Sequence, residues 1–161
     1  MNERLISDIC ASYSVPSIYI CELLAEKEGY FSKIIPISKN CFTARNINNT
    51  ENIRYYKPTG CRSEFFNINA LNDNKPYCVI TEGEFDCLSF ENAGINAMAL
   101  CSVNNINKFI SMQKPQKKTY ILALDNDAMG KKTTDTLIEY FKGNNIDSGK
   151  LLRKQTASGR R

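Results

Sequence analysis

Histidine is absent from all 161 positions of the sequence. The seven cysteines form no C-x-x-C pair, so a zinc finger or zinc ribbon of the usual ligand spacing is excluded. Without histidine, Ser-His and Cys-His nucleophilic catalysis is excluded as well. Carboxylates acting with a metal ion remain the evident chemistry. Cys78 and Cys101 lie in apolar runs and are interpreted as small buried hydrophobic residues in a reducing compartment.

Long hydrophobic runs are also missing. No apolar stretch approaches the roughly 20 residues that a membrane-spanning helix needs, and the N-terminus lacks the apolar region of a signal peptide. With 42% hydrophobic and 24% charged residues, the composition is typical of a globular domain with one core. We therefore expect a soluble, cytoplasmic protein with no membrane partner.

Positive charge is unevenly distributed. The net charge is +4, but five basic residues lie at the C-terminal end, which leaves 16 basic and 17 acidic residues in positions 1–149. Within that nearly neutral body, residues 33–75 hold seven basic and three acidic residues. This local excess suits a nucleic-acid backbone or a nucleotide triphosphate, and Tyr55 and Tyr56 are candidates to stack on bases. The alternative is a solvated β-hairpin with ordinary surface lysines.

Acidic residues follow two apolar runs of strand type. Residues 77–80 and 120–124 show little polar alternation and are predicted to be buried parallel strands. Glu82 follows the first run, and Asp125 and Asp127 follow the second. Because open α/β sheets bind ligands at the carboxyl ends of their strands, neighbouring strands would bring these carboxylates to one or two metal ions. Oxygen ligands without cysteine or histidine favour Mg2+ or Mn2+ over zinc.

A structural alternative exists for the same carboxylates. Acidic side chains at helix N-termini cap the helix and are stabilised by its dipole. Two neighbouring carboxylates repel each other unless a positive charge lies between them, and Lys131 and Lys132 offer such a charge in place of a metal ion. Lys131, at the start of a predicted helix, is also a candidate phosphate contact.

The order of these motifs resembles a known family. The pattern E-G-x-x-D at 82–86 and the pattern D-x-D-x-x-G at 125–130 resemble the Toprim domain shared by bacterial-type primases, topoisomerases and some nucleases. Residues 79–89 are most similar to the primases and primase-helicases of phages and mobile elements. Four upstream segments resemble the basic region that precedes Toprim in the same primases: 35–37, 42–46, 54–58 and 65–67. The resemblance spans about residues 33–145.

The resemblance implies an α/β fold with a mostly parallel, Rossmann-type sheet flanked by helices and preceded by a small α+β segment. It implies primer synthesis on single-stranded DNA by nucleotidyl transfer dependent on Mg2+ or Mn2+, in phage or mobile-element replication. Glu82 is then a metal ligand or proton acceptor, Asp125 and Asp127 are metal ligands, and these three are the catalytic residues. Asp86 is either a further ligand or a residue that supports the ligands without contacting the metal. The basic residues implied to hold template or nucleotide are Arg45, Arg54 and Lys57.

Two other functions remain open. A Toprim nuclease of the phage-defence type would use the same carboxylates with water as the nucleophile. A catalytically weak remnant of a primase would bind nucleic acid or regulate without catalysis. The chain has no P-loop motif, so a helicase is a candidate partner only as a separate protein.

The chain is expected to comprise a helical element, a basic β-rich segment, a Toprim domain and a flexible basic tail, over residues 1–32, 33–74, 75–147 and 148–161. Two short amphipathic helices are predicted within 3–28. A helix-turn-helix interpretation is disfavoured because Glu22, Glu26 and Glu28 in the second helix would repel phosphates.

Within the Toprim segment, apolar spacing predicts a helix over 85–93 ended by Gly94, a strand over 97–100, a short helix near 106–110 and a last helix from 128 to about 143. The related primases continue with another strand and an acidic K-D-x-N-E segment. Here the chain runs through 147–150 into a Ser-, Gly- and Arg-containing end, so this further acid is missing. We expect a truncated or minimal form.

Overall fold

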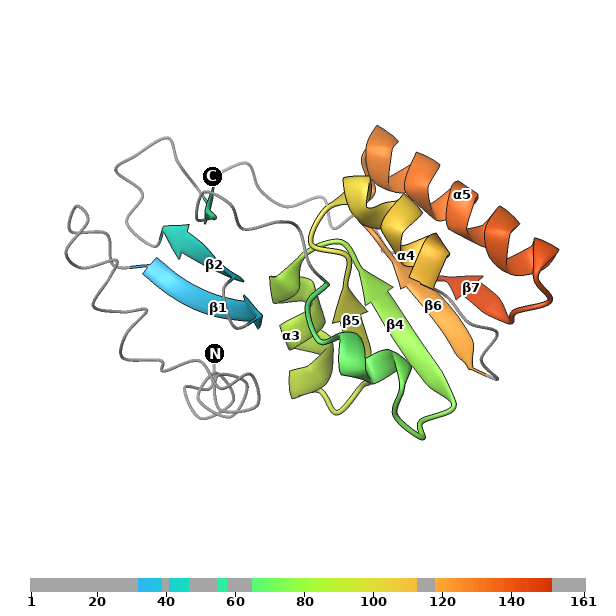
Figure 1. Cartoon of the computed structure of the whole chain (residues 1–161), viewed down its shortest axis with the longest axis horizontal. Helices are drawn as coiled ribbons and strands as arrows, with labels where there is room; N and C mark the ends of the chain where they lie inside the picture. The colour runs from blue at the N-terminus through green and yellow to red at the C-terminus, as the bar shows by residue number, and fades with distance from the viewer. Residues whose placement is uncertain (1–31, 39–40, 47–54, 58–64, 113–117, 152–161) are drawn as a thin grey trace. The chain divides into compact units, whose positions relative to one another are not determined.

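The computed structural model describes residues 32–38, 41–46, 55–57, 65–112 and 118–151. The chain divides into two compact units, Met1–Phe66 and Asn67–Arg161, which are described separately (Figure 1). The predicted helical element at 1–32 and the basic residue Arg54 lie outside the described residues, apart from Ser32. No helix in the described part of the chain has the length and apolarity needed to cross a membrane.

The first unit contains a small antiparallel sheet. Its strands are β1 (Ser32–Ser38), β2 (Cys41–Asn46) and β3 (Tyr55–Tyr56), in that order across the sheet. Ile35 and Ile37 of β1 and Phe42 of β2 are buried. This arrangement agrees with the β-rich character predicted for this part of the chain. Cys41 is disulfide-bonded, which the sequence analysis did not anticipate.

The second unit is built on a four-stranded parallel sheet. Its strands are β4 (Tyr77–Thr81), β5 (Ala97–Ala99), β6 (Thr119–Ala123) and β7 (Ser148–Lys150), arranged in the order β5-β4-β6-β7. The two strands predicted from apolar runs are therefore hydrogen-bonded neighbours, and they are parallel. Cys78, Ile80 and Leu122 are almost fully buried, as expected for strands covered on both faces.

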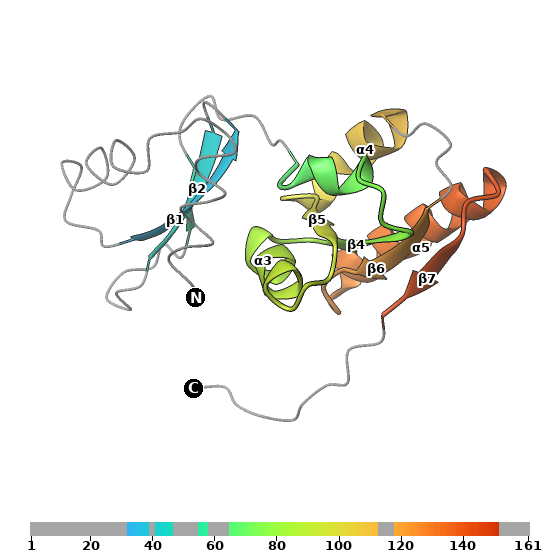
Figure 2. The ribbon, with the colours of Figure 1, turned by 90° about the horizontal axis from the view of Figure 1, so that it is seen from below.

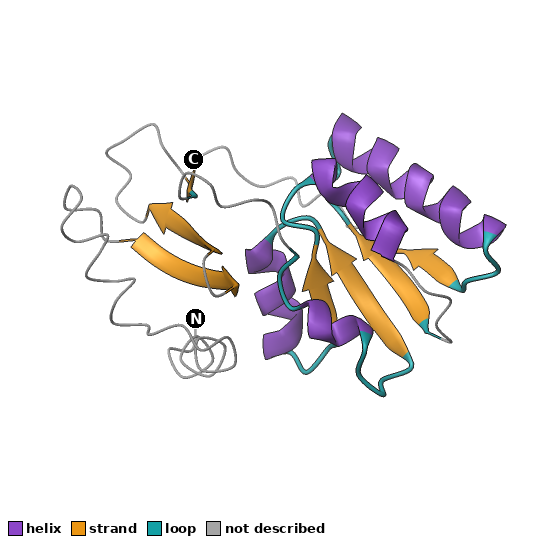
Figure 3. Cartoon of the chain, viewed as in Figure 1, coloured by secondary structure: helices purple, strands orange, loops and turns teal. Residues whose placement is uncertain are grey.

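Helices flank this sheet (Figure 3). They are α3 (Glu84–Asn92), α4 (Ile106–Met112) and α5 (Ala128–Gly143), with short 3-10 turns η1 (Ile68–Leu71) and η2 (Val103–Asn105). Tyr120 of β6 stacks on Phe141 of α5 with ring centroids 4.8 Å apart, and Phe109 of α4 meets Phe141 edge-on at 6.4 Å. These aromatic contacts pack α4 and α5 together against the sheet. The α/β fold expected from the sequence is confirmed.

The strand β7 corrects the sequence analysis, which gave no strand after the last helix and began a flexible tail at residue 148. Ser148–Lys150 pairs in parallel with β6, and the neighbouring Leu151 N–H donates to the Leu122 carbonyl at 2.8 Å. The strand lies at the sheet edge opposite β5 (Figure 2). Its sequence, Ser-Gly-Lys, contains no apolar residue, because backbone hydrogen bonds to β6 suffice to form an edge strand.

A buried lysine, Lys118, hydrogen-bonds to the segment that precedes β4. The Lys118 ammonium is only 6% exposed and donates to the carbonyl of Ala70 at 2.9 Å and to that of Asp73 at 3.0 Å. It also forms an ion pair with the Asp73 carboxylate. The Asn96 amide donates to the same Ala70 carbonyl at 2.9 Å. One charged group and one amide thus satisfy the polar backbone of this connection.

Replacing Lys118 by methionine is expected to lower the free energy of unfolding by about 2–4 kcal/mol, because Asp73 and two carbonyls lose their charged donor. The Asp73 side chain is 32% exposed, so water limits the loss. Urea unfolding followed by circular dichroism measures it. Lys142→Met, at an exposed lysine near the end of α5, is the matched control. Equal unfolding midpoints for the two variants would show that the buried network contributes nothing.

Candidate metal centre

The ends of β4 and β6 bring the predicted acidic residues to one edge of the sheet. Thr81, the last residue of β4, is in register with Ala123, the last residue of β6. Glu82 follows the first strand directly, and Asp125 lies two residues beyond the second. Parallel pairing in this register brings both acids to the carboxyl edge, where ligands of open α/β sheets bind.

Glu82 has an unusual environment for a carboxylate. Its Oε2 atom is buried and has no hydrogen-bond partner among the described residues. Burial raises the pKa of Glu82, and the nearby negative charges of Asp125 and Asp127 raise it further, with a smaller contribution from Asp86. A hydrogen bond with the Asp125 backbone acts in the opposite direction. The four acids predicted as metal ligands therefore interact electrostatically around one buried oxygen.

Asp127 caps the last helix. It is the N-cap residue of α5, and its Oδ1 atom accepts a hydrogen bond of 2.7 Å from the Gly130 N–H. The helix-cap alternative considered for this residue is therefore realised for one of its two oxygens. Capping also fixes the orientation of the carboxylate that follows β6.

Gly130 allows the helix to begin against the Asp125 backbone. A Cβ atom at position 130 would lie 2.1 Å from the Asp125 carbonyl oxygen, far inside contact distance. Only glycine permits this approach, so the final glycine of D-x-D-x-x-G has a steric role. The packing holds the loop 125–127 in place between β6 and α5.

Asp86 lies in the first turn of α3, where an acidic side chain is favourable near the helix N-terminus. The N-cap of this helix is Gly83, which offers no side-chain cap. A Cβ at Gly83 would lie 3.8 Å from the Asp86 Oδ2 atom, an ordinary contact, so this glycine is not required by steric crowding. Helix stabilisation and a supporting role beside Glu82 are both compatible with this position.

These residues fit a hard divalent cation. No group of three ligating side chains in the described part of the chain is close enough to form a complete metal cage. Mg2+ does not need one, since it keeps several waters and is usually held by one or two carboxylates. The buried, unpartnered Oε2 of Glu82, facing the charges of three aspartates, is the arrangement that such an ion would neutralise.

Comparison with known proteins assigns this site to a family. Residues 79–157, which include both acidic motifs, match the family model described as Toprim-like. Residues 79–157 are a Toprim-like domain.

The proteins similar to this chain include a DNA primase. The chain is 33% identical over 115 residues to a DNA primase of Mycoplasma genitalium, a match covering 65% of this chain and 19% of the primase. It is 36% identical over 91 residues to an uncharacterized protein of the same organism, covering 54% of this chain and 41% of that protein. The matches thus span less than half of either relative. The chain is a primase-like Toprim protein.

A solved structure supports the fold. The Aquifex aeolicus primase, in a structure of its zinc-binding and RNA polymerase domains, superimposes with a TM-score of 0.57 at 18% sequence identity. The match covers 76% of this chain and 34% of that one. At this identity the likeness shows only that the two chains share an arrangement of helices and strands.

The predicted basic residues lie in both units. Arg45 and Lys57 belong to the first unit, where the Arg45 guanidinium lies 5.8 Å from the ring centroid of Tyr55. Tyr55 is 50% exposed, which leaves part of its ring accessible. Lys131 belongs to the second unit and is exposed on the first turn of α5. The sequence analysis missed a polar neighbour of Lys131: Lys150 of β7, which lines the same pocket.

Substitution of Glu82 by glutamine is expected to stabilise the metal-free protein near neutral pH. Because the pKa of Glu82 is raised from its ordinary value of 4.5, the folded state binds its proton more tightly than the unfolded state does. The stability supplied by this group is therefore present at low pH and is lost as pH rises through the raised pKa. Glutamine cannot ionise and avoids the loss.

Thermal unfolding in EDTA at about pH 4 and about pH 7 measures this effect. The melting temperature of Glu82→Gln is expected to exceed that of the unmodified protein at the higher pH and to approach it at the lower one. Glu139→Gln, at an exposed glutamate of α5, serves as the control and is expected to change neither value. A Glu82 variant that is less stable near neutral pH would contradict the assigned environment.

Proposed function

We propose that this chain is a primase-type nucleotidyltransferase that joins nucleotides on single-stranded DNA with Mg2+ or Mn2+. The observation that carries the proposal is the buried Oε2 of Glu82, which has no described partner and belongs to a carboxyl whose pKa is raised by burial and by the negative charges of Asp125 and Asp127. The similarity to a DNA primase supports this reaction class. Replication of a phage or mobile element is the setting we infer from residues 79–89, and the cytoplasm is its location.

Glu82, Asp125 and Asp127 would hold the cation, with Asp86 beside them. A bound divalent cation supplies positive charge for the triphosphate of an incoming nucleotide. In the reaction, a 3′ hydroxyl forms a bond to the α-phosphorus, and the bond to pyrophosphate breaks. Glu82 is our candidate to accept the hydroxyl proton. Its pKa is raised in the metal-free protein by burial and by the charges of Asp125 and Asp127, and a bound cation would act in the opposite direction.

Single-stranded DNA would be held by the first unit. Arg45 lies over the ring of Tyr55, and the half-exposed ring offers a face on which a base can stack. Lys57 is half-buried and follows the short strand β3 directly. Together with Arg54, these residues form the basic segment proposed to contact the template backbone. Template unwinding would require a separate helicase as partner.

Incorporation of labelled nucleotides on single-stranded DNA, with Mg2+ or Mn2+ and gel separation of the products, tests the proposal. New short oligonucleotides are the expected result. Shortening of the DNA template instead would replace this proposal with the Toprim nuclease. DNA binding without any metal-dependent product would identify the chain as a binding protein and would also overturn the proposed reaction.

A further inference from the structure

Thr81 is a fully buried polar residue at the end of β4. Its exposed fraction is 0%, and it follows the apolar residues Val79 and Ile80 of the same strand. Valine has nearly the same shape as threonine and would suit a buried strand position without the cost of burying a hydroxyl group. The contacts of this hydroxyl group are therefore what distinguishes threonine from valine at this position.

The hydroxyl group links the end of β4 to the turn that follows it. Thr81 Oγ1 lies 3.1 Å from the Gly83 carbonyl oxygen and 3.1 Å from the Met98 carbonyl oxygen of β5. A hydroxyl group has one hydrogen, which is donated to one of the two carbonyls or shared between them. The Gly83 carbonyl also accepts a hydrogen bond of 3.2 Å from the Cys87 N–H in α3. The backbone on both sides of Glu82 is thereby tied to β5 and to α3.

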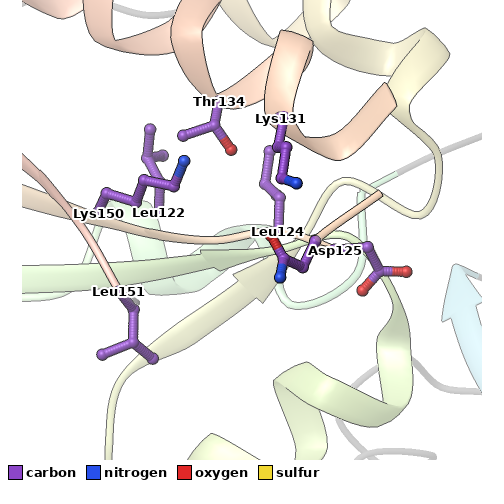
Figure 4. Close-up of a pocket in the computed structure, with 8 residues that line it drawn as sticks. Leu122, Leu124, Asp125, Lys131, Thr134, Lys150 and Leu151 are labelled. Atoms are coloured by element: carbon purple, nitrogen blue, oxygen red, sulfur yellow. The ribbon is translucent and has the colours of Figure 1, made fainter. Parts of the chain in front are cut away.

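Glu82 depends on this backbone for its position. Its buried Oε2 atom has no hydrogen-bond partner in the described part of the chain. The other two candidate ligands are held in other ways, since the Asp127 carboxylate caps α5 and the Asp125 backbone packs closely against the same helix. Figure 4 shows the Asp125 carboxylate pointing away from Lys131 and Lys150, so these lysines do not orient it.

We propose that Thr81 is a positioning residue of the metal site, which holds the Glu82 carboxylate in place for the cation through its hydrogen bond to the Gly83 carbonyl. Thr81 would not contact the ion itself, because its buried hydroxyl group is directed at backbone carbonyls. Removing a group that orients a metal ligand typically costs about 10–100-fold in metal affinity or activity. This inference rests on the proposed metal-dependent function and adds to it a residue outside the acidic set.

Binding of Mn2+ to the full chain, followed by electron paramagnetic resonance of the free ion, tests this role. Thr81→Val keeps the shape of the side chain, removes the hydroxyl group and is expected to raise the Mn2+ dissociation constant by about tenfold. Thr81→Ser restores a hydroxyl group and is expected to stay within about twofold of the unmodified value. Thr136→Val is the matched control, because the exposed Thr136 hydroxyl also donates to a backbone carbonyl, that of Lys132, at 2.9 Å. It is expected to leave Mn2+ binding unchanged.

A double-mutant cycle separates a role that acts through Glu82 from a general loosening of the sheet edge. In the Glu82→Gln background, Thr81→Val is expected to change the Mn2+ dissociation constant by less than about twofold, because the ligand that Thr81 positions is already lost. A further loss of about tenfold in that background would show that Thr81 supports the fold rather than Glu82, against the proposal.

Three other results would overturn the positioning role: unchanged Mn2+ affinity in Thr81→Val, an equal loss in Thr81→Ser, or no Mn2+ binding by the unmodified chain. Nucleotide incorporation by the same variants distinguishes this inference from the proposed reaction. Weaker Mn2+ binding by Thr81→Val in a chain that forms no product would overturn the reaction and support the positioning role. Circular dichroism verifies the fold, and Thr81→Ala, with the same expected loss, replaces Thr81→Val if that variant does not fold.

Discussion

Glu82→Gln is expected to reduce metal-dependent nucleotide incorporation by about a hundredfold or more, while the fold is retained. Glutamine keeps the size and one side-chain oxygen but removes both the negative charge and the ability to accept a proton. Glu82 is half-buried, and its buried Oε2 has no described partner to lose. The substitution therefore removes chemistry without breaking a hydrogen bond of that atom.

The matched control is Glu139→Gln, the same chemical change at an exposed position of α5, which is expected to leave incorporation unchanged. Asp125→Asn is expected to reduce incorporation at least as strongly as Glu82→Gln does, because both residues are assigned to the same cation. Product formation is followed on a gel, and circular dichroism verifies the fold. Full activity in either site variant would remove these carboxylates from the proposed mechanism.

Gly130→Ala is expected to have the second large effect, although residue 130 carries no chemistry of its own. The new Cβ would lie 2.1 Å from the Asp125 carbonyl, so the loop 125–127 or the start of α5 must move. Overpacking of this kind costs about 1–3 kcal/mol of unfolding free energy. A displacement of catalytic groups by about 1 Å can cost about a hundredfold in rate. Stability and activity are therefore expected to fall together.

Gly143→Ala is the matched control, since a Cβ at the last residue of α5 would meet no atom within 4 Å. Urea unfolding and incorporation assays on both variants separate close packing from a general effect of alanine. If Gly130→Ala retained full stability and activity, the close contact between α5 and the Asp125 backbone would be wrong. A loss equal to that of Gly143→Ala would show that the position is not special.

Much of the Toprim domain could be predicted because its signals are local. The apolar runs before Glu82 and Asp125 form parallel strands, as predicted, and the structure makes them hydrogen-bonded neighbours. The helix predicted to be ended by Gly94 runs to Asn92 with Ala93 as its C-cap, and Gly94 follows with a φ of 76°, which favours glycine. The burial of Cys78 was also confirmed, whereas Cys101 is only half-buried.

Other features could not be predicted because they depend on distant partners. Lys118 hydrogen-bonds to residues 45 and 48 positions away in sequence, and no local pattern indicates that it is buried. Strand β7 forms through backbone pairing with β6, and its three residues carry no periodic pattern. The pocket beside Lys131 needs β7, so it was missed for the same reason.

The candidate site contains one feature that the sequence predicted and one that it could not decide. Sequence order was enough to place Glu82 and Asp125 at one edge of the sheet. It could not decide between capping and metal binding for Asp127, because one carboxylate has two oxygens and one of them caps α5. The assignment of Glu82, Asp125 and Asp127 as metal ligands remains a prediction. The basic residues Arg45 and Lys57 likewise await a test with DNA.

Binding of Mn2+, followed by electron paramagnetic resonance of the free ion, tests the central claim most directly. Mn2+ prefers the same oxygen ligands as Mg2+ and is visible to the method. We predict saturable binding to the unmodified chain that Glu82→Gln weakens by about tenfold or more, with Glu139→Gln unchanged. Equal Mn2+ binding by the unmodified chain and Glu82→Gln, or no binding at all, would contradict a metal centre at this edge of the sheet.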